Sequence, residues 1–240
     1  MENNRIFYAT DQTAETGALA KTFMANVFLW MTIAMVVTAV TAYWFAISPN
    51  LIGSLINMET GGLSTLGWVV TLAPLGFVLL MSFGYQKLSP AILTLLFLSF
   101  SVLMGMSLSF ILLAYTAASV YKTFAITAGM FGIMAITGYT TKTDLTKFGS
   151  IMMMGLIGLV IAMVINIFLK SSTLEYIISI IGVLVFTGLT AYDVQKLKRI
   201  GSSGMDQVNQ RKMSLMGALT LYLDFINLFL FMLRFLGDRR

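Results

Sequence analysis

The sequence predicts an all-α polytopic membrane protein with seven transmembrane helices, the last of which lies at the centre of the bundle. Hydrophobic residues make up 58% of the 240 residues and charged residues only 10%, and the mean hydropathy is +0.88. Apolar runs of about twenty residues, the length that a helix needs to cross a bilayer, recur along the chain. Strands of a membrane barrel would instead appear as alternating segments of about ten residues.

The last apolar run, residues 212–236, contains an acidic residue, Asp224, near its middle. An acid at the centre of a membrane helix costs about 2.5–3.5 kcal/mol, so we expect Asp224 to face protein or water rather than lipid. At helical spacing, mostly small or polar residues share its face: Gly217, Thr220, Asn227, Phe231 and Arg234. This stripe predicts that the last helix is surrounded by the others and that the function lies along it.

The chain is predicted to consist of a polar N-terminal tail, residues 1–21, and a seven-helix transmembrane domain, residues 22–236. The first apolar run, 22–46, is too long for a signal-peptide core and is not followed by a clear cleavage site, so we interpret it as a transmembrane helix. A loop is expected at 48–62. The other six helices are expected at about 63–83, 90–115, 120–141, 148–169, 174–197 and 212–236.

Prolines and small residues justify several of these helices. Pro90 suits the first turn of the third helix, and Pro74 predicts a kink in the second helix that neighbouring helices satisfy. Small residues about four apart let two helix backbones approach closely. Two such sets are Ser101, Gly105 and Ser109 in the third helix, and Gly155, Gly158 and Ala162 in the fifth.

The positive charges predict the orientation in the membrane. Five of the 15 Lys and Arg residues lie on one side of a seven-helix arrangement: Lys122, Lys170, Arg234, Arg239 and Arg240. The other ten lie on the N-terminal tail and the even-numbered turns, which places the N-terminus in the cytoplasm and the C-terminus outside. The pair at 239–240 counts against this orientation. No stripe of basic and aromatic residues indicates nucleic-acid binding.

The chain has no cysteine and no histidine. The first absence excludes a disulfide, a thiolate metal site and a thiol nucleophile. The second means that a pH response near neutrality would depend on carboxyl groups, since histidine is the usual switch in that range.

Only Asp193 and Asp224 among the acidic residues fall inside apolar segments. The sixth and seventh helices run antiparallel, and at about 1.5 Å per residue the two acids differ in depth by roughly one to two turns. If they meet, they cannot both ionise at low cost, so the pair would share one proton. Alternatively, each acid is capped separately by a Thr, Asn, Tyr or Arg neighbour and only fixes helix packing.

A pair that shares a proton would be a pH-sensitive gate. The proton would hold the two helices together, and its loss would let repulsion loosen them and leave oxygen ligands for a hard cation such as Ca²⁺. Asp193 and Asp224 are therefore the candidate pH sensor, ion gate and calcium ligands. Thr220, Asn227 and Arg234 are candidate pore-lining residues. We expect no catalytic residue and no cofactor, with Ca²⁺ as a permeant ion.

Four segments resemble the Bax inhibitor family (transmembrane Bax inhibitor motif proteins), in a bacterial form. They are LYLDFINLFLFMLRFLG at the end, AYD followed by a basic run, GMSLSFILLAY, and TTKTDL. The resemblance extends from the first helix onward, and LYLDFINLF is its most specific part. It implies a seven-helix protein of the cell inner membrane, a pH-sensitive calcium leak channel whose aspartate pair maps onto Asp193 and Asp224.

The second helix departs from the pattern of some members of this family. Those members have a glutamate and an arginine there that join the gate, whereas STLGWVVTLAPLGFVLLMSF has neither. The departure counts against calcium conduction in this protein, or against gating that uses those two residues. Arg234 is a possible substitute cation, but it lies about 15 Å beyond Asp224 along the helix, too far for direct pairing.

Two other functions remain open. The protein could be a non-conducting regulator that binds a membrane protease or another membrane complex through its tail and its charged loop, 196–212. It could also be an intramembrane aspartyl protease, because Tyr192-Asp193 fits the first half of that active site. The second half should be a Gly-x-Gly-Asp turn, and here it is Tyr222-Leu223-Asp224. No later proline follows either, so we expect no enzymatic activity.

Overall fold

The computed structural model describes residues 2–57 and 61–239, and side chains from Gly17 onward within them. Its helices are α1 (Glu2–Ile47), α2 (Pro49–Leu55), α3 (Thr65–Gly84), α4 (Pro90–Ala114), α5 (Ala117–Thr140), α6 (Thr146–Leu169), α7 (Ser172–Gly201) and α8 (Gln207–Leu236). All except α2 are long and apolar enough to cross a membrane, giving 7 candidate spans in the described part of the chain. The predicted all-α, seven-span fold is confirmed.

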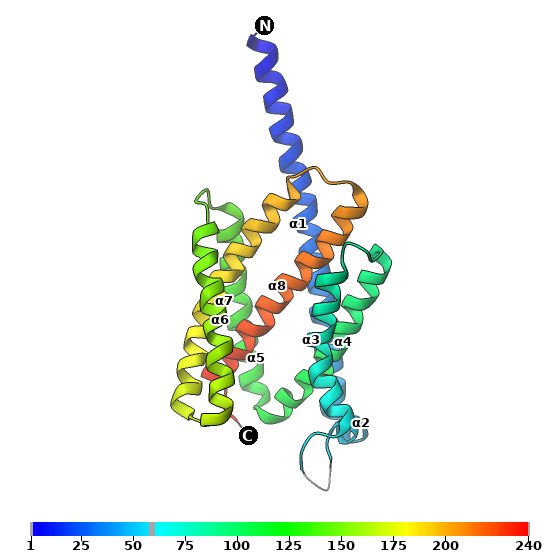
Figure 1. Ribbon diagram of the computed structural model, residues 1–240, viewed down its shortest axis with the longest axis vertical. Helices are drawn as coiled ribbons and strands as arrows, with labels where there is room; N and C mark the ends of the chain where they lie inside the picture. Colours follow the sequence, from blue (N-terminus) through cyan, green and yellow to red (C-terminus); the bar gives the residue numbers. More distant parts are fainter. Residues whose placement is uncertain (1, 58–60, 240) are drawn as a thin grey trace.

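Two segments near the start of the chain differ in detail from the expected ones. The α1 helix already begins at Glu2, and its first part projects beyond the other helices (Figure 1). The division between tail and transmembrane domain at residue 21 stays a prediction. The predicted loop at 48–62 contains the short helix α2, which Pro49 begins because proline suits a first helical turn.

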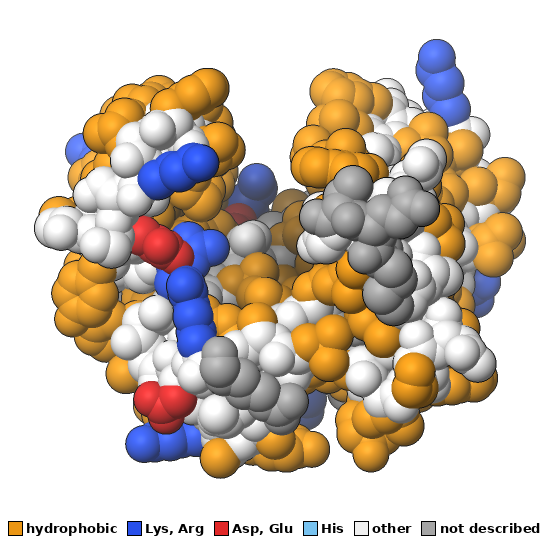
Figure 2. Space-filling model, turned by 90° about the horizontal axis from the view of Figure 1, so that it is seen from below, with side chains coloured by type: hydrophobic (Ala, Val, Ile, Leu, Met, Phe, Trp, Pro, Cys, Tyr) orange, Lys and Arg blue, Asp and Glu red, His pale blue; other side chains and the backbone are white. Residues whose placement is uncertain are grey.

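The helices form two groups with α8 between them. In Figure 1, α2, α3 and α4 lie on one side and α5, α6 and α7 on the other, and α8 crosses diagonally. The α1 helix packs against α4, α7 and α8, while α8 contacts α1, α4, α5 and α7. Figure 2 views the end that carries the C-terminus and shows a hollow between the two groups, whose outer surfaces are mainly hydrophobic.

The α8 helix is the most buried of the candidate spans. In its apolar segment 72% of the residues are buried, whereas in that of α6 only 6% are. Small residues allow this: Gly217 lies against Leu197 of α7 and Val27 of α1, and Ala218 is fully buried. The predicted central position of the last helix is confirmed.

Two glycines mark close approaches between helix backbones. A Cβ atom on Gly105 of α4 would lie 2.6 Å from the carbonyl oxygen of Thr38 in α1, and one on Gly138 of α5 would overlap the carbonyl oxygen of Ala191 in α7. The small-residue set of α4 therefore packs against a helix, as predicted. The set in α6 does so only in part, because Gly158 has nothing within 4 Å.

Candidate functional site

Asp193 and Asp224 lie side by side in the interior. Asp193 is on α7 near the α7–α8 loop, and Asp224 is near the middle of α8. They are 7% and 5% exposed, and their side chains are close enough to interact electrostatically. Because an ionised carboxylate has no proton to donate, the two carboxyl groups could hydrogen-bond to each other only with a proton on one of them. The structure thus brings the two predicted acids together, while their role as a gate stays a prediction.

The surroundings of the two acids differ. The Oδ2 atom of Asp224 is buried and has no hydrogen-bond partner among the described residues. Asp193 has a charged neighbour, Lys196, one turn further along α7. The ammonium of Lys196 lies 5.9 Å from the centre of the Tyr192 ring. Asp224 therefore has an oxygen without a partner among the described residues, and Asp193 has a positive charge nearby.

Two of the predicted lining residues are half-buried on α8. The Thr220 hydroxyl donates to the carbonyl oxygen of Met216 at 3.1 Å, and the Asn227 amide donates to that of Leu223 at 2.8 Å. Because both donors are used within the helix, the side-chain oxygens of Thr220 and Asn227 remain as acceptors. Thr220 lines the same small cavity as Asp193.

Arg234 lies at the far end of α8 and bonds away from the acid pair. Its Nε atom is 3.6 Å from a carboxyl oxygen of Glu175, at the start of α7. Its guanidinium also lies 5.8 Å from the centre of the Phe231 ring. This placement agrees with the expected separation from Asp224, and a pore-lining role for Arg234 stays a prediction.

Aromatic rings fill the interior on the C-terminal side of the pair. Phe124 and Phe131 of α5 both pack edge-on against Phe225, each with ring centres 5.5 Å apart. Further along α8, Phe231 stacks with Phe186 of α7 at 5.8 Å. Rings packed this closely leave little room for water. These rings therefore pack α8 closely against α5 and α7 beyond the acid pair.

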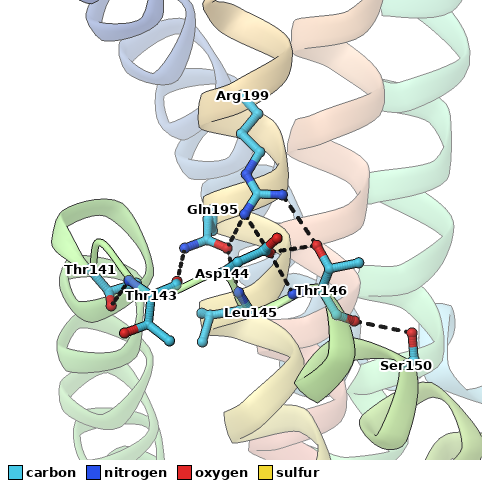
Figure 3. A network of polar contacts seen from close by, with 8 residues as sticks. All are labelled: Thr141, Thr143, Asp144, Leu145, Thr146, Ser150, Gln195 and Arg199. Atoms are coloured by element: carbon cyan, nitrogen blue, oxygen red, sulfur yellow. Dashed lines mark hydrogen bonds and ion pairs between the residues drawn. The ribbon is translucent and has the colours of Figure 1, made fainter.

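The loop end of α7 is clamped to the turn between α5 and α6 (Figure 3). The Gln195 amide accepts from the backbone N–H of Leu145 and donates to the carbonyl oxygen of Thr143, both at 2.8 Å. Arg199 forms an ion pair of 2.6 Å with Asp144. The hydrogen bond from Arg199 holds the pKa of Asp144 well below its ordinary value. The helix that carries Asp193 is thus fixed at its loop end.

A short hydrogen-bond chain joins α8 to α1 and α4. The Thr38 hydroxyl donates to the carbonyl oxygen of Ser101 at 2.9 Å and lies 2.7 Å from the Tyr222 hydroxyl. A threonine hydroxyl has a single proton, so Tyr222 must donate to Thr38. The chain holds α8 against α1 and α4 two residues before Asp224.

Sequence reasoning missed several of these residues. Lys196 could have been found, because it stands three residues after Asp193 and so lies on the same helix face. The Tyr222–Thr38 bond joins residues 184 positions apart and has no local signal. The cavity beside Asp193 depends on how α7 and α8 pack, which residue spacing does not give.

Comparisons with known proteins place these features in a family. The family model described as inhibitor of apoptosis-promoting Bax1 matches residues 20–240. Inner membrane protein YbhL of Escherichia coli (strain K12) is 46% identical over 236 residues, which is 98% of this chain and 99% of that protein. The uncharacterized protein RP147 of Rickettsia prowazekii is 45% identical over 219 residues, 91% of this chain and 90% of its own length. An uncharacterized protein of Borreliella burgdorferi is 45% identical over 219 residues, with 91% and 92% covered.

Proposed function

The chain belongs to the Bax inhibitor family, and we propose that it is a pH-sensitive cation leak channel gated by Asp193 and Asp224. The seven apolar helices and the relative named as an inner membrane protein support a multi-pass protein of the bacterial inner membrane. We place the loop between α7 and α8 on the cytoplasmic side, as the distribution of positive charge predicts.

The observation that carries this proposal is the contact between the two buried acids. Two neighbouring carboxyl groups in a site shielded from water would hold one proton between them, because two adjacent negative charges would repel strongly. At low pH this proton joins α7 to α8. Once it is lost, repulsion between the two carboxylates opposes the packing of the same two helices.

The clamp on α7 determines which helix responds. Gln195 and Arg199 tie the loop end of α7 to the turn before α6, whereas Asp224 lies in mid-helix with one oxygen unpartnered among the described groups. Loss of the proton therefore moves α8 relative to a fixed α7. The movement would separate the aromatic rings around Phe225 and open a passage between α8 and α5.

The pair of carboxyl groups suits a permeant cation better than a tightly bound one. Ca²⁺ takes 6–8 oxygen ligands, and two carboxylates supply about four at most, so water or carbonyl oxygens would supply the rest. No cluster of three or more acidic residues that could hold a metal ion occurs in residues 17–57 and 61–239. A site of this kind would bind Ca²⁺ weakly and release it readily.

Ion flux in proteoliposomes at several pH values tests the proposal. We expect flux to rise with pH in the wild type, and to lose this dependence in Asp193→Asn and in Asp224→Asn. Asp238→Asn is the matched control, because Asp238 is exposed after the end of α8 and accepts a hydrogen bond from Ser119 instead. If both buried-acid variants keep the wild-type pH dependence, the gate is wrong.

A second function is favoured by the first part of α1. This segment projects beyond the other helices (Figure 1), where it could bind a membrane protease or another membrane complex. Under this proposal the protein is a regulator that does not conduct. Deletion of residues 1–18 separates the two functions: loss of a co-purifying partner with flux unchanged favours the regulator, and unchanged partner binding counts against it.

We propose no enzymatic activity, although two adjacent aspartates also form the active site of intramembrane aspartyl proteases. Asp224 follows Tyr222-Leu223 rather than the Gly-x-Gly expected of those enzymes. Incubation with peptide substrates, with and without an aspartyl-protease inhibitor, tests this. Cleavage that the inhibitor blocks and that Asp224→Asn abolishes would contradict the proposal.

A further inference from the structure

Two neighbouring cavities lie at the loop end of α8. The larger, of about 320 Å³, is lined by Tyr85, Gln86, Met205, Asn209, Lys212 and Met213. The smaller, of about 120 Å³, is lined by Asp193, Lys196, Leu197, Ile200, Met213, Met216, Gly217 and Thr220. The smaller cavity therefore reaches Asp193, and the larger begins at the turn between α3 and α4.

Met213 is the one residue, among those described, that lines both cavities. It is half-buried in the first turns of α8 and belongs to a side-chain type with three rotatable bonds and no branch. Such a side chain can change rotamer without moving the backbone. The side chain that the two cavities share can therefore move aside.

We propose that the two cavities form an access path for water and protons from the α7–α8 loop to Asp193, and that the Met213 side chain closes it. The inference rests on the proposed function in one respect: the proton that the path delivers is the one shared by Asp193 and Asp224. The path itself is a separate physical property, since access to the cavity can be measured without ion flux.

The charges along the path favour protons over metal cations. Its lining carries two ammonium groups, Lys212 in the larger cavity and Lys196 in the smaller, and a single carboxyl group, Asp193, at the inner end. Lys212 donates to the carbonyl oxygen of Gln86 at 3.1 Å, which holds it at the mouth. Two fixed positive charges repel a divalent cation, whereas water can relay a proton past them.

Two charged or titratable groups act on Asp193: Asp224 of α8 and Lys196 of α7. The remaining charged groups near this end of α7 face elsewhere. Lys198 donates to the carbonyl oxygen of Tyr139 in α5, Arg199 is paired with Asp144 before α6, and Lys21 of α1 is exposed. The proton on the acid pair would therefore equilibrate with the compartment on the α7–α8 loop side, through the path that Met213 closes.

The absence of cysteine from the chain gives a direct test. A single cysteine at Thr220, in the smaller cavity, is treated with a membrane-impermeant thiol reagent in vesicles, from each side in turn. A cysteine at Ser203, which is exposed in the α7–α8 loop, reports the side on which the loop lies. We expect Thr220→Cys to react only from the side that labels Ser203→Cys.

Substitutions at Met213 test the closing side chain. If the open rotamer is a minor state populated at roughly 10% or less, Met213→Ala should speed labelling of Thr220→Cys by about 10-fold or more. Met213→Phe should slow it, and Met213→Leu, of similar volume, should change it little. Asn227→Cys, two turns deeper on α8, is the control that should not respond to any of them.

Labelling of Thr220→Cys equally from both sides, or at a rate that neither Met213→Ala nor Met213→Phe changes, would overturn the path. Unfolding curves of each variant show whether a changed rate reflects a changed fold, and the opposite directions expected for Ala and Phe keep the test valid if one variant fails to fold. A different result would overturn the proposed function while leaving the path intact. If flux shows no dependence on Asp193 or Asp224 while labelling behaves as expected, the path stands and the gate does not.

Discussion

The α6 and α8 helices are both apolar spans, yet they occupy opposite places in the molecule. The apolar segment of α6 has a mean hydropathy of 2.6, and only 6% of its residues are buried. The apolar segment of α8 has a mean hydropathy of 1.8, and 72% of its residues are buried. In water the more hydrophobic helix would be the buried one. In a bilayer lipid is as apolar as a leucine side chain, so small and polar residues select the helix that packs inside.

The side-chain chemistry of α6 and α8 differs in the same way as their burial. The large hydrophobic side chains that α6 exposes are Ile, Val, Met, Phe and Leu, which lipid solvates. In the interior, α8 carries Asp224, the Tyr222 hydroxyl and Gly217, each beside a specific neighbour on α1 or α7. A charged or polar group inside the membrane costs free energy, so its presence indicates function. We therefore expect the less hydrophobic helix to carry the function.

The largest stability difference is expected between a glycine packed against α8 and a glycine on the outer surface of α6. In Gly182→Ala, on α7, the new Cβ would lie 2.6 Å from the Phe231 ring of α8, and such overpacking typically costs about 1–3 kcal/mol. The control is Gly158→Ala on α6, where nothing lies within 4 Å and alanine should gain roughly 0.5–1 kcal/mol. Unfolding in mixed detergent micelles measures both, and equal effects would contradict the comparison.

A smaller effect is expected for the hydrogen bond that ties α8 to α1. Tyr222→Phe removes the donor to Thr38 and should cost about 0.6–1.7 kcal/mol, the range found for hydrogen bonds between membrane helices. Tyr176→Phe is the matched control, because Tyr176 is exposed and packs on Phe235 through its ring. The same unfolding assay applies. A loss as large in Tyr176→Phe would show that the buried bond contributes nothing particular.

The smallest effect is expected at the clamp on α7, and it concerns pH. The pKa of Asp144 is lowered by its hydrogen bond from Arg199, so the clamp contributes its full stability above the ordinary aspartate pKa of about 3.9 and loses it as pH falls through the lowered value. Hydrogen exchange of the turn at 141–146 should therefore be protected equally at pH 5 and pH 7, after correction for the intrinsic rate. Protection lost at pH 5 would be inconsistent with this ion pair.

Much of the fold was predictable because hydropathy reports membrane helices directly. The central position of α8 also followed from sequence, since Asp224 stands on a face of small and polar residues. Helix ends were less well predicted: α7 continues to Gly201 and α8 begins at Gln207, whereas the sequence indicated 197 and 212. These extra turns carry charges, so hydropathy does not detect them, although Asp206 caps α8 by accepting from the N–H of Asn209.

The candidate site was predictable only in its acids. Asp193 and Asp224 stand out because each interrupts an apolar run, and the antiparallel order of two consecutive helices places them at similar depth. Met213 does not stand out, because methionine is common in this chain and usually fills space. Its position between two cavities depends on the crossing of α7 and α8 and on the turn at Gln86. Such contacts are set by tertiary packing alone.

The central claim, that Asp193 and Asp224 share one proton, is tested most directly by infrared spectroscopy of the carboxyl C=O stretch. We predict one protonated carboxyl group in the wild type at low pH, whose band disappears over the same pH range in which flux rises. The band should be absent from the double variant Asp193→Asn/Asp224→Asn. A wild type without such a band, or a double variant that keeps it, would contradict the account.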